Sequence, residues 1–267
     1  MKDVVIGLGE IGKPIYQLLS KSGIVVGYDL NHKLMDLKKF EKLKDENTDF
    51  LHISIPFSDK FQKSVNNFVK QFDPKYIVIH STLSPGTTEK IQKKLDIPVI
   101  YSATRGIHKR MSKDLKRYSK FYSVYNWAPN SKDIQKEFNK KMKKAGIKTK
   151  KMSSPLVLEL AKIVVDTSYY GWLINYAQLS NMIAIENDVN YDEMWSFADE
   201  IHAIVRNRPK LYPGFIGGHC VIPNLDLIHH QTLDLIKEIN LKYIKKVPKA
   251  KLINSKYEKS KKRSYDV

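Results

Sequence analysis

The first thirty residues carry the feature that most constrains the fold of this chain. An apolar run at residues 4–6 passes directly into the sequence GLGEIG at residues 7–12, and an amphipathic run follows it. In such a turn the first glycine permits the bend, the second lets a pyrophosphate approach the backbone, and the third lets the helix pack on the strand. The phosphate is then held at the positive amino end of the helix. We therefore predict a dinucleotide-binding turn, with cofactor contacts from Gly7, Gly9, Glu10, Ile11 and Gly12.

A second apolar run, at residues 24–28, ends in Asp29, twenty-two residues after Gly7. A carboxylate at this place hydrogen-bonds the ribose 2′-hydroxyl of NAD and repels the 2′-phosphate of NADP. The sequence therefore favours NAD as the cofactor, although the neighbouring His32 and Lys33 leave NADP open.

The rest of the first half alternates strand-like and helix-like segments, which predicts an α/β fold with a Rossmann-type doubly wound, mostly parallel sheet. We expect an NAD-binding domain over residues 1–152. Ligands bind at the carboxyl ends of the strands in such sheets, so Pro56, Ser81, Thr82 and Arg105 are expected at the cofactor cleft. The expected strands are residues 4–6, 24–28, 50–55, 76–80, 98–101, 120–125 and 148–152, and the expected helices include 59–71, one from Glu89, and 132–145.

Residues 102–118 form a polar, basic stretch that we expect to be irregular. Loops that follow core strands often carry substrate contacts, so Arg105 and His108 are candidates for binding substrate. A lysine-rich surface loop is an equally good interpretation of the same residues.

The formal net charge of +18 is concentrated in two stretches, because residues 105–151 carry +13 and residues 241–267 carry +8. Such asymmetry attracts anions, among them phosphorylated small molecules, nucleic acid and acidic membrane surfaces. Because no nucleic-acid-binding module is recognisable, we expect a small anionic substrate and no nucleic acid.

The chain contains no apolar run near the roughly 18 residues of a membrane span, and its amino terminus enters a strand without signal-peptide character. The single cysteine, Cys220, excludes an internal disulfide. We therefore expect a cytoplasmic protein without a membrane span, and we assign no metal ligands.

The second half is predicted to be a smaller all-helical domain, residues 153–240, followed by a basic C-terminal tail, residues 241–267. A capping serine and a proline at residues 154 and 155 begin a helix, and residues 156–187 contain no proline, so one long or kinked helix is expected. A second helix is expected from Tyr191 to about Val205. The long helix is rich in aromatic residues, which favour packing against a second subunit, so we expect a homodimer.

Two groups of residues in this half could carry chemistry. Glu159, Lys162 and Asp166 stand at i, i+3 and i+7 among apolar neighbours, on nearly one helix face, although solvated surface charges would show the same spacing. Cys220 follows two glycines and a histidine, and paired glycines bring backbone N–H groups within reach of a developing charge. A small core residue is the alternative interpretation of this cysteine.

Four motifs together resemble the UDP-glucose/GDP-mannose dehydrogenase family. They are GxGxxG at residues 7–12, STLSPGTT at 81–88, ELAK at 159–162 and GGHC at 217–220, and the resemblance covers roughly residues 1–230. The stretches TRGIH at 104–108, DTSYYGW at 166–172 and VIPN at 221–224 look more narrowly like a short branch of the family. That branch lacks the C-terminal nucleotide-sugar-binding domain and is associated with polysaccharide biosynthesis.

The resemblance implies a role for several residues. Cys220 would take a sugar aldehyde as a thiohemiacetal, Lys162 would stabilise the developing oxyanion, and Thr82 would stand near the hydrolytic water. The glycine-rich turn would contact the substrate through Gly217, Gly218 and His219.

This sequence departs from the family at three points. The family has asparagine four residues after the lysine and aspartate four residues after the cysteine, whereas this chain has Asp166 and Asn224. We therefore hypothesise that Asp166 handles the proton. The family's acidic residue after the fifth strand is also replaced here, by the sequence SATR at residues 102–105.

The sequence thus favours an NAD-dependent oxidoreductase that oxidises an alcohol or aldehyde of a sugar or sugar-nucleotide-like anion, with Cys220 near the nicotinamide. One alternative is a two-electron dehydrogenase of hydroxy-acid type, in which Lys162 is the acid/base. Another is a protein that binds NAD or a polyanion without catalysis.

Overall fold

The computed structural model describes residues 1–218 and 220–247. The chain divides into two compact units, Met1–Lys162 and Ile163–Val267, which are described separately here. The domain division predicted at residues 152 and 240 stays a prediction. The predicted C-terminal tail lies outside the described residues from residue 248 onward.

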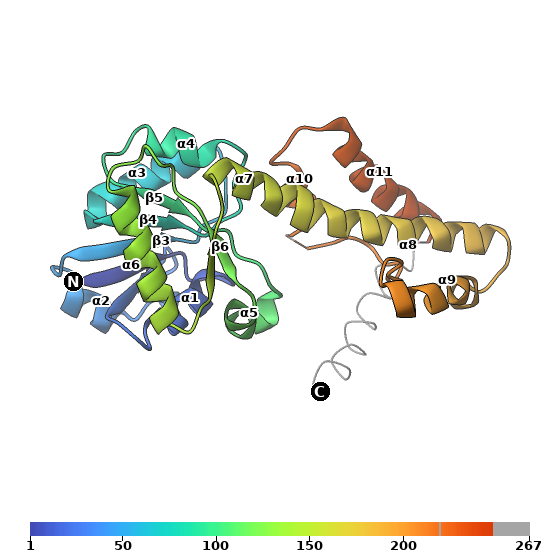
Figure 1. Ribbon diagram of the computed structural model, residues 1–267, viewed down its shortest axis with the longest axis horizontal. Coiled ribbons are helices and arrows are strands. Elements are labelled where there is room, and N and C mark those ends of the chain that lie inside the picture. Colours follow the sequence, from blue (N-terminus) through green and yellow to red (C-terminus); the bar gives the residue numbers. More distant parts are fainter. Residues whose placement is uncertain (219, 248–267) are drawn as a thin grey trace. The chain divides into compact units, whose positions relative to one another are not determined.

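The first unit contains a five-stranded parallel sheet with strand order β2-β1-β3-β4-β5 (Figure 1). The chain therefore reverses its direction of winding at β1, with β2 on one side and β3 on the other. In doubly wound sheets this switch point opens the crevice where ligands bind. The strands are β1 (Lys2–Ile6), β2 (Val25–Tyr28), β3 (Thr48–Ile53), β4 (Tyr76–Ile79) and β5 (Val99–Tyr101). The predicted fold class is confirmed.

A second, two-stranded parallel sheet adjoins the first through an antiparallel bridge between Tyr101 and Ser123. It consists of β6 (Lys120–Tyr122) and β7 (Thr149–Lys151). Because β6 is antiparallel to β5 at this bridge, Lys120 lies beyond the carboxyl end of β5. This places strand β6 beside the loop that follows β5.

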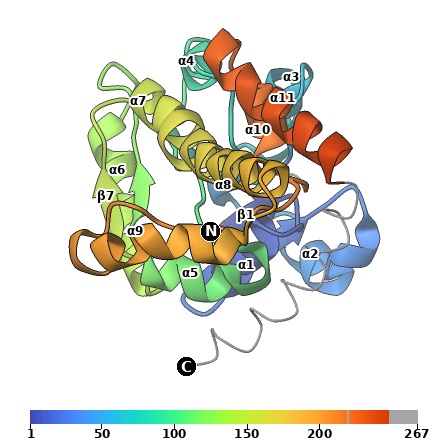
Figure 2. The ribbon, with the colours of Figure 1, turned by 90° about the vertical axis from the view of Figure 1, so that its right-hand side faces the viewer.

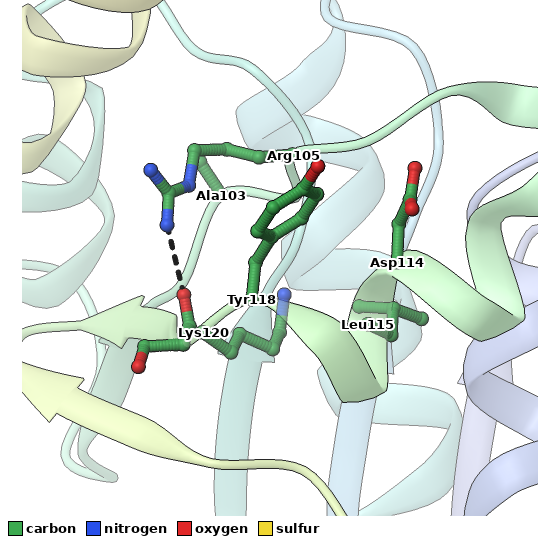
Figure 3. A pocket seen from close by; sticks show the side chains of 7 residues that line it. Ala103, Arg105, Asp114, Leu115, Tyr118 and Lys120 are labelled. Carbon is green, nitrogen blue, oxygen red and sulfur yellow. Dashed lines mark hydrogen bonds between the residues drawn. The ribbon is translucent and has the colours of Figure 1, made fainter. Parts of the chain in front are cut away.

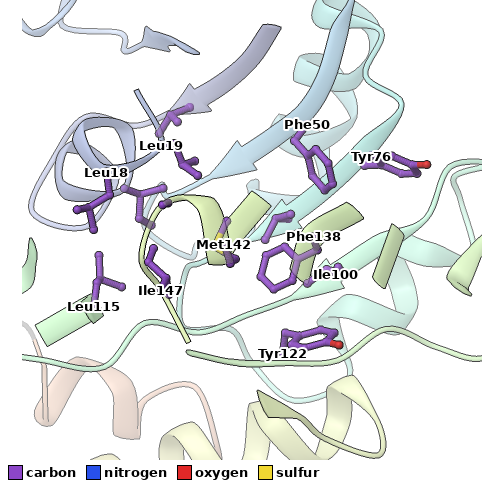
Figure 4. Close-up of a cluster of buried hydrophobic side chains, with 14 of the residues drawn as sticks. Leu18, Leu19, Phe50, Tyr76, Ile100, Leu115, Tyr122, Phe138, Met142 and Ile147 are labelled. Carbon is purple, nitrogen blue, oxygen red and sulfur yellow. The ribbon is translucent and has the colours of Figure 1, made fainter. Parts of the chain in front are cut away.

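Helices cover both faces of the five-stranded sheet, and each face has its own apolar cluster. One cluster joins the strands to α1 (Gly12–Leu19), α5 (Met111–Arg117) and α6 (Ser131–Lys144), with Phe50 and Phe138 near its centre (Figure 4). The other joins the strands to α2 (Leu37–Leu43), α3 (Phe61–Phe72), α4 (Thr87–Gln92) and α7 (Pro155–Leu160). Short 3-10 turns occupy His32–Leu34 and His108–Arg110.

The expectation of an irregular chain over residues 102–118 is wrong in its second half. Residues 111–117 form α5 because Met111 and Leu115, one turn apart, are buried against the sheet. The lysines and arginines between them dominate the sequence and hide this apolar pair.

A row of buried polar side chains crosses the sheet from β1 to the end of β5. His80 Nδ1 lies 3.3 Å from the carbonyl oxygen of Ser102, which can only accept, so this nitrogen carries the proton. Burial holds the pKa of His80 well below its usual value, so the ring is neutral and its Nε2 accepts from His52 Nδ1 at 3.0 Å. The remaining nitrogen of His52 faces the Asp3 carboxylate at 3.9 Å.

The second unit is helical, as predicted. It contains α8 (Tyr169–Glu186), α9 (Tyr191–Val205), α10 (Ile222–Leu225) and α11 (Gln231–Lys246), with α9 and α11 on different sides of α8 (Figures 1 and 2). The predicted helix start is confirmed, because the Ser154 side chain accepts from Val157 N and Pro155 follows it. The chain passes from one unit to the other within a π-helical segment, Ala161–Ser168, which the sequence did not predict. In the described part of the chain, no helix is long and apolar enough to span a membrane.

The buried histidines predict a specific acid sensitivity. Burial lowers the pKa of both His52 and His80, so the unfolded chain binds more protons than the folded one below pH of about 6.5. Stability is therefore full above that pH and is lost as the pH falls, by up to about 1.4 kcal/mol per pH unit for each proton. Replacement of His80 by Gln should flatten the pH dependence of the unfolding free energy between pH 7 and 5, measured by urea denaturation. His229→Gln, at an exposed histidine, should leave the wild-type slope, and an equal effect of both variants would contradict the account.

Candidate functional site

The predicted glycine turn brings three backbone segments into very close contact. A Cβ atom on Gly12 would lie 1.7 Å from the carbonyl oxygen of Gly7, and one on Gly7 would lie 2.8 Å from the oxygen of Ser54, at the end of β3. Gly7 also has a φ of +82°, which only glycine adopts without strain. The space at Gly9 is open. The turn therefore presents bare backbone at the amino end of α1, which is the arrangement that a pyrophosphate needs.

Asp29 lies where the sequence places it, at the end of β2 and beside the glycine turn. Its carboxylate accepts from Leu8 N at 2.6 Å and from Asn31 N at 2.8 Å. A carboxylate has about four lone-pair directions, so these two contacts fix its orientation and leave acceptor capacity for a ribose hydroxyl.

The loop after β5 reaches the glycine turn through a direct contact. His108 Nδ1 and the Glu10 carboxylate are 2.6 Å apart. One predicted substrate residue and one predicted cofactor residue therefore meet at the same edge of the sheet. Arg105, in the same loop, is exposed, and its guanidinium donates to Ser119 O at 3.0 Å.

The turn after β4 forms a second part of this edge. Ser81 is nearly buried and donates to Ile55 O at 2.5 Å, next to the exposed Pro56, while Thr82 is half-buried. These residues lie in the segments that follow β3 and β4, as predicted.

Glu159 stabilises the helix that follows this turn. Its fully buried carboxylate accepts from Gly86 N at 2.6 Å, from Thr88 N at 2.9 Å and from Thr88 Oγ1 at 2.6 Å. Burial raises the pKa of Glu159, and these three donors oppose the rise. The carboxylate thus satisfies N–H groups at the amino end of α4 that have no partner within the helix.

The common face predicted for Glu159, Lys162 and Asp166 stays a prediction. Glu159 is buried, Lys162 is half-buried and Asp166 is exposed. Lys162 and Asp166 lie in the π-helical segment, whose wider turn changes the spacing of side chains around the helix. Such segments frequently occur at functional sites.

The cysteine turn belongs to the second unit. Gly218 has a φ of +79°, Cys220 is exposed, and Asn224 is half-buried in α10. Val221 and Leu225 are buried with Ile216 and Ile236, so the residues around the cysteine anchor the turn and leave the thiol at the surface. Gly217 is exposed, and His219 lies outside the described residues.

A buried amide network and one glycine position this turn. Asn240 of α11 accepts from Ile216 N at 2.9 Å and donates to Ile216 O at 3.1 Å, and Gln178 of α8 donates to Gly214 O at 2.6 Å. A Cβ on Gly171 would come within 3.0 Å of Val221. The single glycine of the long helix therefore lets the cysteine turn pack closely on α8.

The predicted residues thus fall into two groups. The first unit holds the glycine turn, Asp29, the residues after β3, β4 and β5, and Lys162, whereas the second holds Asp166, Cys220 and Asn224. The meeting of Cys220 with Lys162 stays a prediction. Over residues 1–218 and 220–247, no three His, Cys, Asp or Glu side chains are grouped so as to hold a metal ion.

Two buried charged residues of the site were missed. Lys120 and Asp114 are 4% and 1% exposed, and both bind the loop that carries Arg105. Lys120 was interpreted only as the start of a strand, and Asp114 was masked by the surrounding basic residues.

No protein-family model matches the chain. A UDP-N-acetyl-D-glucosamine 6-dehydrogenase from Salmonella typhi is 24% identical over 274 aligned positions, which cover 83% of this chain. The chain spans only 60% of the length of that relative.

Solved structures show the same fold. A UDP-D-ManNAc dehydrogenase from Pyrococcus horikoshii matches with a TM-score of 0.71 at 20% identity, over 91% of this chain and 69% of its own. A 3-hydroxyisobutyrate dehydrogenase from Mycobacterium tuberculosis matches with a TM-score of 0.67 at 12% identity, over 91% of this chain and 93% of its own. In sequence and in fold, the chain resembles the nucleotide-sugar dehydrogenases that its motifs indicate.

Proposed function

We propose that the protein is an NAD-dependent oxidoreductase that oxidises a nucleotide sugar or a related anionic sugar. The observation that carries this proposal is the bare backbone turn at residues 7–12 with Asp29 fixed beside it, which together suit a dinucleotide with a 2′-hydroxyl. The relatives named for UDP-sugar oxidation support the substrate class. The positive charges exposed in the loop that follows β5, among them Arg105, suit a phosphorylated ligand.

NAD, when bound, supplies the hydride acceptor, and the chain's own residues do the rest. The amino end of α1 would hold the pyrophosphate and Asp29 the adenosine ribose. The Cys220 thiol would add to a sugar aldehyde, with its proton passing to Asp166, and the Lys162 ammonium would stabilise the oxyanion. The aldehyde itself would come from oxidation of the alcohol, with the first hydride passing to one NAD. The thiohemiacetal would pass a second hydride to a second NAD, which gives a thioester, and attack by water would release the acid and restore the thiol.

The thiol is tested most directly by Cys220→Ser. With NAD and UDP-N-acetylglucosamine as the probe, we expect formation of the uronic acid to fall by about 10³-fold or more, because serine is a far poorer nucleophile at neutral pH. Products are separated by mass spectrometry and NADH is followed by absorbance. Undiminished acid formation by the variant would contradict the role of the thiol.

The Lys162 and Asp166 variants separate charge stabilisation from proton transfer. Lys162→Met should lower kcat by about 10²- to 10³-fold with little change in KM, because the charge acts on the transition state. Asp166→Asn should lower kcat and alter the pH–rate profile. Lys148→Met, which removes an exposed lysine ahead of β7, is the matched control and should behave as wild type. Unchanged turnover in Asp166→Asn would contradict the role of Asp166 in proton transfer.

A two-electron dehydrogenase of hydroxy-acid type is the second candidate. The observation that favours it is that the fold matches that of a 3-hydroxyisobutyrate dehydrogenase with a TM-score of 0.67, near the 0.71 of the matched UDP-sugar enzyme. In that case Lys162 would be the acid/base, and Cys220→Ser would spare a single oxidation that yields one NADH per substrate.

The helical unit would also join two copies of the chain. Helix α9 presents Phe197, Ile201 and Ile204 on one face, and their side chains are 89%, 40% and 80% exposed. Tyr176 and Ile183 are exposed on α8 in the same unit. Apolar side chains exposed on one helix face suit an interface, and identical chains most commonly pair as twofold dimers.

A charge on this face should prevent pairing. Phe197→Asp combined with Ile204→Asp should give a monomer by analytical ultracentrifugation at concentrations where the wild type is a dimer. Asp199→Ala, a substitution on the opposite side of α9, is the control and should leave the dimer intact. A double variant with the wild-type mass in solution would contradict this interface.

A further inference from the structure

A lysine ammonium group is enclosed beside the loop that carries Arg105 (Figure 3). Lys120 is 4% exposed, and its Nζ donates to Ser102 O at 2.9 Å and to Thr104 Oγ1 at 3.0 Å. Both acceptors are uncharged oxygens. Lysines are almost never fully buried unless they pair with an acid, so this placement is unusual.

The residues on either side of Lys120 hold Arg105 itself. Arg105 donates to the carbonyl oxygen of Ser119 at 3.0 Å, and its guanidinium lies 4.7 Å from the ring centre of Phe121. Residues 119–121, at the start of strand β6, therefore bind the loop at three successive positions, of which only Lys120 can change its charge.

The other side of the same loop is held by a buried carboxylate. Asp114 of α5 accepts from Ile107 N at 2.9 Å and from Arg110 Nε at 3.0 Å. Gly106 packs so closely that a Cβ would lie 2.8 Å from Asp114. The loop is thus fixed between two buried charges of opposite sign, which leaves it little freedom to move.

Charged and titratable groups lie near Lys120 on the elements packed around it. Burial, together with the positive charges of Arg105 and Lys162, lowers the pKa of Lys120 to about 7. His80, which directly follows β4, lies near enough for the charge of Lys120 to lower its pKa, and neutral His52 contacts His80 on the side of β3. On the α5 side, Asp114 and Tyr118 line the same small cavity, of about 10 Å³.

We propose that Lys120 is a positioning residue of the candidate site, which fixes the Arg105 loop against β6 and takes up a proton when an anionic ligand binds beside Arg105 and Lys162. This rests on the proposed function only in assuming that the ligand is an anion at this edge. Arg105 and Lys162 repel a positive charge on Lys120. A negative charge bound beside them offsets this repulsion, so the protonated form of Lys120 becomes favourable. The proton comes from solvent, and no bond to the ligand is formed.

The test measures proton uptake and does not need turnover. UDP is titrated by calorimetry into protein saturated with NAD, at pH 7.5, in two buffers of different ionisation enthalpy. If the anion raises the pKa of Lys120 by about one unit, the wild type should take up about half a proton more than Lys120→Met. Lys148→Met, which loses an exposed positive charge from the same region, should keep the wild-type uptake.

A second variant guards against misfolding of Lys120→Met. Thr104→Val keeps the lysine but removes one of its acceptors, so the pH midpoint of proton uptake should move to lower pH. Equal uptake in wild type and Lys120→Met, an unmoved midpoint in Thr104→Val, or no binding of UDP to the wild type would each overturn the proposal.

The same experiment separates this inference from the proposed function. Uptake that depends on Lys120, without oxidation of any nucleotide sugar, would leave the positioning role standing and remove the proposed activity. Oxidation of UDP-N-acetylglucosamine, with proton uptake that does not depend on Lys120, would support the proposed activity and remove the positioning role of Lys120.

Discussion

The close approach of backbone at Gly7 and Gly12 is the constraint on which the rest of the first unit depends. With a Cβ of Gly12 placed 1.7 Å from the oxygen of Gly7, no other residue fits without moving α1 away from β1. That movement would also separate Leu8 from Asp29, since the two are joined by a 2.6 Å hydrogen bond. One steric condition thus sets the position of the helix dipole, the bare N–H groups and the Asp29 carboxylate.

Buried charges build the remainder of this edge of the sheet. Glu159 caps α4, while Lys120 and Asp114 fix the loop after β5 from its two sides. Each charge is fully or nearly fully buried and hydrogen-bonded, so removal of a partner would leave a desolvated charge unsatisfied, which is costly. Rigid loops of this kind suit a site that must hold a ligand in one orientation, because binding then costs less ordering of the protein.

The sequence predicts the parts of this architecture that local spacing determines. The strands, the glycine turn and Asp29 follow from continuous apolar runs and from the glycine spacing, and the helix start at Ser154 follows from its capping chemistry. The π-helical segment does not follow, because its residue types are those of an ordinary helix. Lys120 and Asp114 do not follow either, because their burial depends on contacts with segments distant in sequence and their residue types suggest the surface. The meeting of Lys162 with Cys220 is a prediction from resemblance alone, because the two residues belong to different compact units and local sequence does not determine how such units are arranged.

The central element of the proposed function is that the Cys220 thiol reacts with a substrate bound beside NAD. The most direct measurement is a crystal structure of the protein with NAD, read for the distance between Cys220 Sγ and C4 of the nicotinamide ring. The account predicts a separation that leaves room for one substrate carbon between them, with each reacting contact about 3–3.5 Å long. A Cys220 side chain directed away from the ring, with other protein atoms between the two, would contradict it.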